Sequence, residues 1–197
     1  RVPGGPVVLI IGRVWAEERG KGHDELLDAW PAVVAAVPGA ELWIVGDGDD
    51  RARLEAKAAA AGVASQVRFL GHVSDAELAR CYATASLFAM PSRQEGFGLV
   101  YAEAMWHGLP CIASTRDAGA EVVRDGATGV LVPYGDAEAL RDALVGLLRD
   151  PARLAAMGEA ARREARERFG YARFKRDLLA ALGLGELGLA ETGGAAA

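Results

Sequence analysis

The chain has 197 residues and a mass of 20.6 kDa; 51% hydrophobic and 25% charged residues exclude wholesale disorder, and the length is typical of one domain. The 22 basic and 27 acidic residues give a net charge of −5, which argues against a nucleic-acid-binding protein and a basic membrane-surface patch. The two cysteines, Cys81 and Cys111, form no disulfide framework, so we expect a reducing, cytoplasmic setting.

Short apolar runs alternate with segments of helical periodicity. The expected strands are 7–11, 41–45, 67–70, 87–90, 110–113 and 130–132. The expected helices are 23–37, 51–61, one opened by a capping box at 74–77, 99–106, 137–148, 152–168 and 172–182. The strands are continuous apolar runs, which is typical of strands buried on both faces of a parallel sheet. We therefore predict an α/β fold: a doubly wound, parallel, six-stranded, Rossmann-like sheet with C-terminal helices.

The two ends of the chain differ in composition from the rest. Residues 1–6 resemble a linker left from a longer protein, since they are neither a signal peptide nor a start with Met. We expect 7–182 to be the folded domain and 183–197, rich in Gly and Ala, to be a flexible tail. No apolar run reaches about 18 residues, so no membrane span is predicted.

The segment 90–105 is the strongest functional signal. A buried strand ends at Pro91, a loop with Gly96 and Gly98 follows, and a helix starts near Leu99. Glycines let a backbone approach a ligand closely. The unpaired amides of Phe97, Gly98 and Leu99 then predict an anion site suited to phosphate.

Two carboxylates belong to the same segment. Glu95 precedes the helix and Glu103 lies within it, so both are expected to face one crevice at the carboxyl ends of the strands. A carboxylate can accept hydrogen bonds from two hydroxyls of a sugar or ribose.

A second segment follows the first strand. Gly12 allows close approach, and Arg13 and Lys21 bring two cations to the same edge of the sheet. Arg can bind a diphosphate with two parallel hydrogen bonds, and Lys supplies a point charge.

Together with Trp-Ile-Val-Gly-Asp-Gly at 43–48, Phe-Leu-Gly at 69–71 and Asp-Gly-x-x-Gly at 125–129, these segments resemble a known family. They are similar to the C-terminal, donor-binding domain of retaining glycosyltransferases with the GT-B fold. The family is the large family four, the group 1 glycosyl transferases, which includes sucrose synthase-like and phosphatidylinositol mannosyltransferase-like enzymes. The resemblance runs from about Val7 to Leu182, nearly the whole chain.

The resemblance implies the role of each residue. Arg13 and Lys21 correspond to residues that bind the donor diphosphate, Glu95 to the residue that contacts the transferred sugar, and Glu103 to the one that holds the ribose. Backbone at Val73 matches the position that contacts the base. The implied catalytic residues are Glu95, Arg13 and Lys21. The implied donor-binding residues are Gly12, Arg13, Lys21, Val73, Glu95, Gly96, Phe97, Gly98, Leu99 and Glu103.

No cofactor is expected besides the donor, a UDP-, GDP- or ADP-sugar. The cations and helix-start amides would replace a divalent metal, and retention would proceed by front-face departure and attack. Asp47-Gly-Asp49 looks like a metal motif, but turn formation and N-capping explain it. The three histidines have no partner at metal-ligand spacing, although His72 lies near the predicted base pocket.

The chain departs from the family in two respects. Ala118-Gly-Ala-Glu121 replaces a Gly-Gly-x-x-Glu pattern, and an N-terminal, acceptor-binding domain of comparable size is missing. The full protein is thus expected to be a hexosyltransferase of polysaccharide or glycoconjugate biosynthesis, and the isolated chain to be inactive in transfer. Association with the inner face of the cell membrane would occur only through the missing domain. The alternatives are a stand-alone nucleotide-sugar-binding module completed by a partner subunit, or a sugar-nucleotide epimerase or hydrolase.

Overall fold

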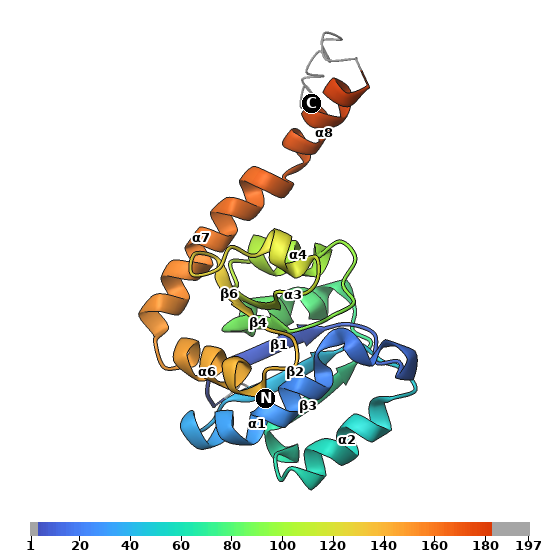
Figure 1. Cartoon of the computed structure of the whole chain (residues 1–197), viewed down its shortest axis with the longest axis vertical. Coiled ribbons are helices and arrows are strands. Elements are labelled where there is room, and N and C mark those ends of the chain that lie inside the picture. The colour runs from blue at the N-terminus through green and yellow to red at the C-terminus, as the bar shows by residue number, and fades with distance from the viewer. Residues whose placement is uncertain (1–3, 183–197) are drawn as a thin grey trace, which may run out of the picture.

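The computed structural model describes residues 4–182 and contains a six-stranded sheet with helices on both faces (Figure 1). The strands are β1 (Val7–Ile11), β2 (Glu41–Val45), β3 (Val67–Gly71), β4 (Leu87–Met90), β5 (Cys111–Ser114) and β6 (Gly129–Val132). The helices are α1 (His23–Ala36), α2 (Arg51–Ala60), α3 (Asp75–Thr84), α4 (Leu99–Trp106), α5 (Gly119–Val122), α6 (Ala137–Leu148), α7 (Pro151–Phe169) and α8 (Tyr171–Ala181), with 3-10 helices η1 (Ala16–Lys21) and η2 (Ala64–Gln66). The predicted tail, 183–197, and residues 1–3 of the predicted linker lie outside the described residues.

The strand order β3-β2-β1-β4-β5-β6, with every pair parallel, confirms the predicted doubly wound sheet. The chain leaves the edge strand β3, crosses the sheet and returns as β4 beside β1, with Leu9 opposite Phe88. The strand order therefore reverses between β1 and β4. In open sheets of this kind, ligands bind at the carboxyl ends of the strands at such a switch point.

The core lies between the sheet and its two layers of helices. Helices α1, α2 and α6 cover one face, and α3 and α4 cover the other (Figure 1). Apart from the edge strands β3 and β6, the strands are almost completely buried, as their continuous apolar runs predict. Phe88 on β4 and Tyr101 on α4 are fully buried and pack edge to face, with ring centroids 5.6 Å apart. Burial of one such side chain stabilises the fold by roughly 1.5–3 kcal/mol.

Local signals fix where the helices start. The predicted capping box is present at α3, where the Ser74 hydroxyl accepts from the Glu77 amide and the Glu77 carboxylate accepts from the Ser74 amide. Asp136 caps α6 by accepting from the Ala139 amide at 2.9 Å. These bonds satisfy backbone N–H groups that have no partner within the helix.

The predicted fifth strand, 110–113, is displaced by one residue. Pro110 has no N–H to donate to a neighbouring strand, so β5 begins at Cys111. The Pro110 carbonyl nevertheless accepts from the Phe88 amide at 3.0 Å, which keeps the chain beside β4.

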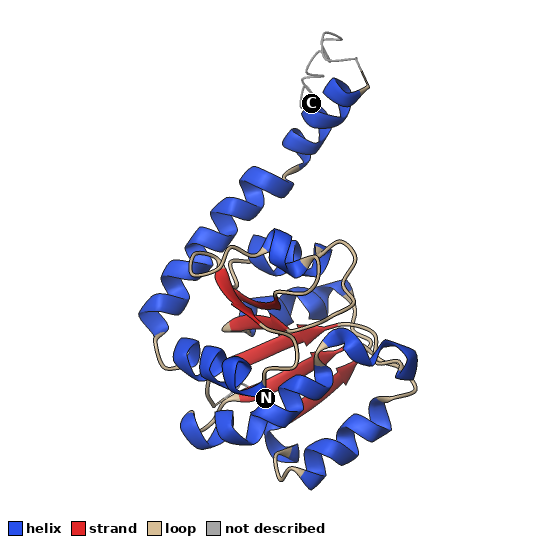
Figure 2. Ribbon diagram, in the orientation of Figure 1, coloured by secondary structure: helices blue, strands red, loops and turns tan. Residues whose placement is uncertain are grey.

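The last helices extend beyond the sheet. α7 packs against the domain with Met157, Ala161 and Ala165 buried, and Figure 2 shows its C-terminal end and α8 projecting from the domain. Tyr171, Phe174 and Leu178 recur at helical spacing on α8, and all three side chains are exposed. Within residues 4–182, no helix is both long enough and apolar enough to cross a membrane.

Candidate functional site

The loops that follow β1 and β4 meet at the switch point. The first loop, residues 12–22, ends in η1 and carries Lys21; the second loop, residues 91–98, carries Glu95. Lys21 Nζ lies 3.0 Å from Glu95 Oε2 and 3.3 Å from the Gln94 carbonyl oxygen. Both charged side chains are largely buried, at 16% and 18% exposure. The structure thus brings two predicted site residues from separate segments into direct contact.

Glu95 is held as an anion. Burial opposes its charge, but hydrogen bonding to Lys21 and to the amides of Gly98 and Phe97 outweighs burial, so the pKa of Glu95 is below its usual value. The Gly98 amide donates to Glu95 Oε1 at 3.3 Å. At neutral pH the carboxylate can therefore only accept hydrogen bonds, such as those from hydroxyl groups. The Gly98 amide, predicted to contact the donor, is used by Glu95 in this structure.

Asp117 holds the second loop in place through hydrogen bonds, and the sequence analysis did not identify this residue. Its carboxylate accepts from the Ser92 hydroxyl, from the Glu95 amide at 3.2 Å and from the Gly119 amide at 2.9 Å. The sequence signal that could have identified Asp117 is its position three residues after the end of β5, which places a carboxylate at the same edge of the sheet.

Arg13 lies at the start of the first loop, at the opposite end from Lys21. Its guanidinium pairs with Glu18 at 2.5 Å, and its side chain is 71% exposed. A pocket of about 480 Å³ opens next to it at the carboxyl ends of β1, β2 and β3. This pocket is lined by Ile11, Gly12, Arg13, Val45, Gly46, Asp47, Gly71, His72, Val73, Asp75 and Leu78. It therefore unites Gly12, Arg13 and Val73, which the sequence analysis placed at the donor.

The remaining predicted residues lie along the start of α4. The amides of Gly96 and Leu99 donate no hydrogen bond within residues 4–182, and the Phe97 side chain is 84% exposed. Glu103, one turn further into α4, is exposed and makes no ion pair with any described residue. It lies near the buried hydroxyl of Tyr82, whose pKa is raised, mainly by burial and further by Glu103. The structure does not bring Glu103 into contact with Glu95.

The carboxylates of the Asp47-Gly-Asp49 segment accept backbone hydrogen bonds, one local and one from the first loop. Asp47 accepts from the Gly48 amide at 3.0 Å, and Asp49 accepts from the Ala16 amide at 2.9 Å. The predicted N-capping is wrong, because the N-cap residue of α2 is Asp50 and its side chain accepts no capping bond. Among the residues described, no group of three or more His, Cys, Asp or Glu side chains is arranged to hold a metal ion.

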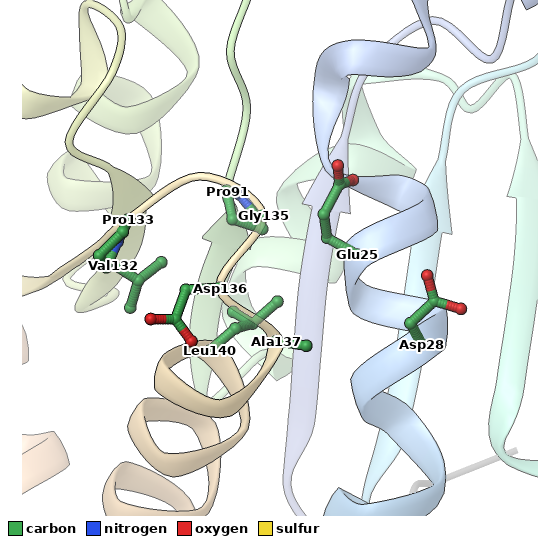
Figure 3. Close-up of a pocket in the computed structure, with 9 residues that line it drawn as sticks. All are labelled: Glu25, Asp28, Pro91, Val132, Pro133, Gly135, Asp136, Ala137 and Leu140. Carbon is green, nitrogen blue, oxygen red and sulfur yellow. The ribbon is translucent and has the colours of Figure 1, made fainter.

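A second hollow, of about 200 Å³, lies at the same edge between α1 and the start of α6 (Figure 3). Glu25, Asp28 and Asp136 contribute three carboxylates to it, and none of the predicted site residues line it. Because like charges repel, this hollow is unsuited to a diphosphate. The Lys21 ammonium is not among the groups that line this hollow.

The geometry and a family comparison point to the same class of protein. Residues 5–150 match the model of a family described as "Glycosyl transferases group 1". The chain belongs to this family. The segment that matches the group 1 glycosyltransferase model includes Lys21, Glu95 and Glu103.

Curated relatives of this group 1 glycosyltransferase chain are mannosyltransferases by name. It is 44% identical over 147 residues to the phosphatidyl-myo-inositol mannosyltransferase of Mycobacterium leprae, covering 74% of this chain and 38% of the relative. It is 42% identical over 149 residues to the GDP-mannose-dependent monoacylated alpha-(1-6)-phosphatidylinositol monomannoside mannosyltransferase of Corynebacterium glutamicum, covering 72% and 38%. The chain thus spans well under half the length of the curated relatives it matches.

A similar solved structure is that of the Anabaena protein Alr3699/HepE in complex with UDP-glucose. The TM-score is 0.81 at 26% identity, covering 92% of this chain and 50% of that chain. The likeness extends the family assignment to the three-dimensional fold.

Proposed function

We propose that residues 7–182 bind the nucleoside-diphosphate-sugar donor of a retaining glycosyltransferase, whose acceptor site is in a further part of the polypeptide. The observation that carries this proposal is the contact between Lys21 and Glu95 at the switch point, 3.0 Å apart. This contact places the Lys21 cation, which can bind a diphosphate, beside the Glu95 anion, which can accept hydrogen bonds from sugar hydroxyls. The chain covers 38% of the length of its mannosyltransferase relatives, which supports a separate acceptor-binding part.

Lys21 and Arg13 bind the diphosphate and stabilise it as the leaving group. An ammonium has three N–H donors. Lys21 uses donors for Glu95 and the Gln94 carbonyl, which leaves one for a phosphate oxygen. Arg13 is mostly exposed and lines the 480 Å³ pocket, so its guanidinium can reach a phosphate of a nucleotide bound in that pocket. These cations take the place of a divalent metal in the proposed reaction.

Glu95 orients the sugar. Since its carboxylate is ionised and fixed by Lys21, it accepts hydrogen bonds from hydroxyls and does not donate a proton. The amides of Gly96 and Leu99, which donate no hydrogen bond within residues 4–182, lie beside it at the start of α4 and bind sugar or phosphate oxygens. The leaving group departs from the same face at which the acceptor attacks, which requires no carboxylate nucleophile in this chain.

The nucleoside occupies the 480 Å³ pocket. Gly12 allows close approach at its floor, and backbone at Val73 contacts the base. Glu103, exposed on α4 near Tyr82, accepts from the ribose hydroxyls. The names of relatives at 42% and 39% identity include GDP-mannose dependence, which supports GDP-mannose as the donor of this chain.

The relatives' names also place phosphatidylinositol glycolipids among their acceptors. We extend this to a function at the inner face of the cell membrane, with contact to lipid made through the acceptor-binding part and not through residues 7–182.

Calorimetric titration with GDP, UDP and ADP, with and without magnesium, tests the proposal. We expect GDP to bind, equally well without the metal, and Glu103→Gln to weaken binding about tenfold through loss of a charged hydrogen bond. Glu159→Gln on α7, which is exposed and outside the site, is the matched control. Binding of no nucleotide, or equal binding by Glu103→Gln, contradicts the proposed site. Release of free mannose from GDP-mannose at an enzyme-like rate indicates a hydrolase instead.

A further inference from the structure

The first loop is attached along its length to the segment 47–50, which follows β2. The Val14 amide donates to the Asp47 carbonyl at 3.1 Å, and the Asp50 amide donates to the Val14 carbonyl at 3.1 Å. The Ala16 amide donates to the Asp49 carboxylate at 2.9 Å. The backbone of the loop is thus fixed up to the start of η1, where irregular structure would otherwise leave the chain free to move.

The Asp50 carboxylate continues this attachment. Asp50 is the N-cap residue of α2, yet its side chain accepts no capping bond. It is 6% exposed and instead receives two hydrogen bonds from Arg19, at 3.0 and 2.7 Å. It also receives bonds from Arg53, the shortest at 2.6 Å. These guanidinium groups hold the pKa of Asp50 far below its usual value.

Arg53 extends the network to the start of α1. Arg53 Nη1 and Nη2 donate to the Asp24 carboxylate at 2.8 and 2.6 Å, and Lys57 Nζ donates to Asp24 at 2.8 Å. Asp50 and its partners therefore join the first loop, α1 and α2. A bidentate pair with a buried carboxylate inside a network contributes more than an isolated surface pair.

Lys21 is two residues beyond Arg19 in η1. The intervening Gly20 is also fixed, because its carbonyl accepts from the Arg93 amide at 2.8 Å. The path from the Asp50 carboxylate through Arg19 and Gly20 to Lys21 is therefore short, and it is held by hydrogen bonds at Arg19 and Gly20. A cation held in place before its ligand arrives loses less entropy on binding.

We propose that Asp50, acting through Arg19, positions Lys21 for the phosphates of the donor. This inference rests on the proposed function, in which Lys21 binds the diphosphate. Asp50 is a positioning residue and not a ligand contact, because its buried carboxylate oxygens are used by Arg19 and Arg53.

The test uses the three lysines of the chain, Lys21, Lys57 and Lys175. In protein labelled with carbon-13 at lysine Cε, the signal that disappears in Lys21→Ala belongs to Lys21. In unliganded wild type we expect the two Hε protons of Lys21 to have distinct shifts, as for a fixed side chain. In Arg19→Met and Asp50→Asn the two Hε shifts of Lys21 should converge on the single value of a freely rotating lysine, while the Lys175 signal stays unchanged.

The second readout is affinity for GDP. We expect Arg19→Met and Asp50→Asn to weaken binding about fivefold to tenfold through lost preorganisation. In a Lys21→Ala background the same substitutions should have no further effect, because they act through Lys21. Arg141→Met, which removes an exposed pair with Asp142 on α6, is the control.

An unchanged Lys21 signal in Arg19→Met, or a full additional loss of affinity in the Lys21→Ala background, overturns the inference. Arg19→Met retains the Arg53–Asp50 pair, so it tests the idea even if Asp50→Asn does not fold. If wild type binds no nucleoside diphosphate, the proposed function is wrong, and the unliganded lysine spectrum still decides whether Arg19 positions Lys21.

Discussion

The first loop and the second loop, which meet at Lys21 and Glu95, are held in different ways. The first loop is joined to α2 by Arg19 and Asp50 and to the segment after β2 by backbone hydrogen bonds. The second loop depends mainly on Asp117 and exposes Phe97. Lys21 is thus carried by a loop that is tied to α2, while the second loop exposes Gly96 and Phe97 to solvent beside Glu95.

This difference matches the two ligand groups that the site is proposed to bind. Every nucleoside-diphosphate sugar has the same diphosphate, so a rigid cationic side suits it. The sugar side must also admit an acceptor from a part of the protein outside residues 7–182. The exposed Gly96 and Phe97 next to Glu95 leave room for such an approach, and the predictions below perturb the two loops in turn.

Loss of the contact between the loops should have the largest effect. Lys21→Ala removes the ammonium that we propose binds the diphosphate and leaves the largely buried Glu95 without its cation. Hydrogen bonds to charged groups contribute about 1.5–3 kcal/mol, so we expect GDP affinity to fall by roughly 10- to 100-fold by calorimetry. Lys175→Ala on α8 is the control, and an unchanged affinity in Lys21→Ala would show that the ammonium does not bind the ligand.

The second prediction concerns His23, which follows the first loop at the start of α1. It is 4% exposed, its Nε2 has no partner among the described residues, and burial lowers its pKa to about 4 from 6.5. The unfolded state therefore binds a proton first as the pH falls. His23 should lower the free energy of unfolding by about 2 kcal/mol between about pH 7 and pH 5.

Urea unfolding at the two pH values checks this, with His23→Gln expected to lose the dependence. The exposed His72 supplies the control, since His72→Gln should retain the wild-type slope. An equal slope in wild type and His23→Gln would show that His23 takes up a proton as readily in the folded as in the unfolded state.

The strands and the two loops were predictable because their signals are local. Strands buried on both faces are continuous apolar runs, and each predicted strand is present, with a shift at Pro110. The carboxyl ends of β1 and β4 had to be neighbours once the sheet was doubly wound, which placed Lys21 and Glu95 at the same edge.

The supports of the loops were not predictable. Arg19 and Asp50 are 31 residues apart, and Ser92 and Asp117 are 25 apart. A charged residue in a loop does not specify its partner, because several carboxylates and guanidiniums lie at similar positions in the sequence. The contact of Gly98 with Glu95 also depends on how the second loop turns in space, which residue types alone do not determine.

Within the second loop, two glycines should respond differently to substitution. Gly98 has φ +70°, and an added Cβ would lie 2.8 Å from Val122 Cγ2; Gly96 has open space around it. We expect Gly98→Ala to lower the free energy of unfolding by about 1–2 kcal/mol and Gly96→Ala to change it by less than about 0.5 kcal/mol. Thermal and urea unfolding of the pair measure this, and equal stabilities would show that the second loop adapts around position 98.

The smallest effect is expected at Phe97. Its side chain is 84% exposed, so Phe97→Ala should change the free energy of unfolding by less than about 0.5 kcal/mol. Its amide hydrogen-bonds to Glu95, and no contact between its ring and the donor is proposed, so GDP affinity should also stay the same. Weaker GDP binding by Phe97→Ala at unchanged stability would show that the ring itself covers the nucleotide. The open second loop would then close over the ligand, and the contrast with the first loop would hold only for the unliganded chain.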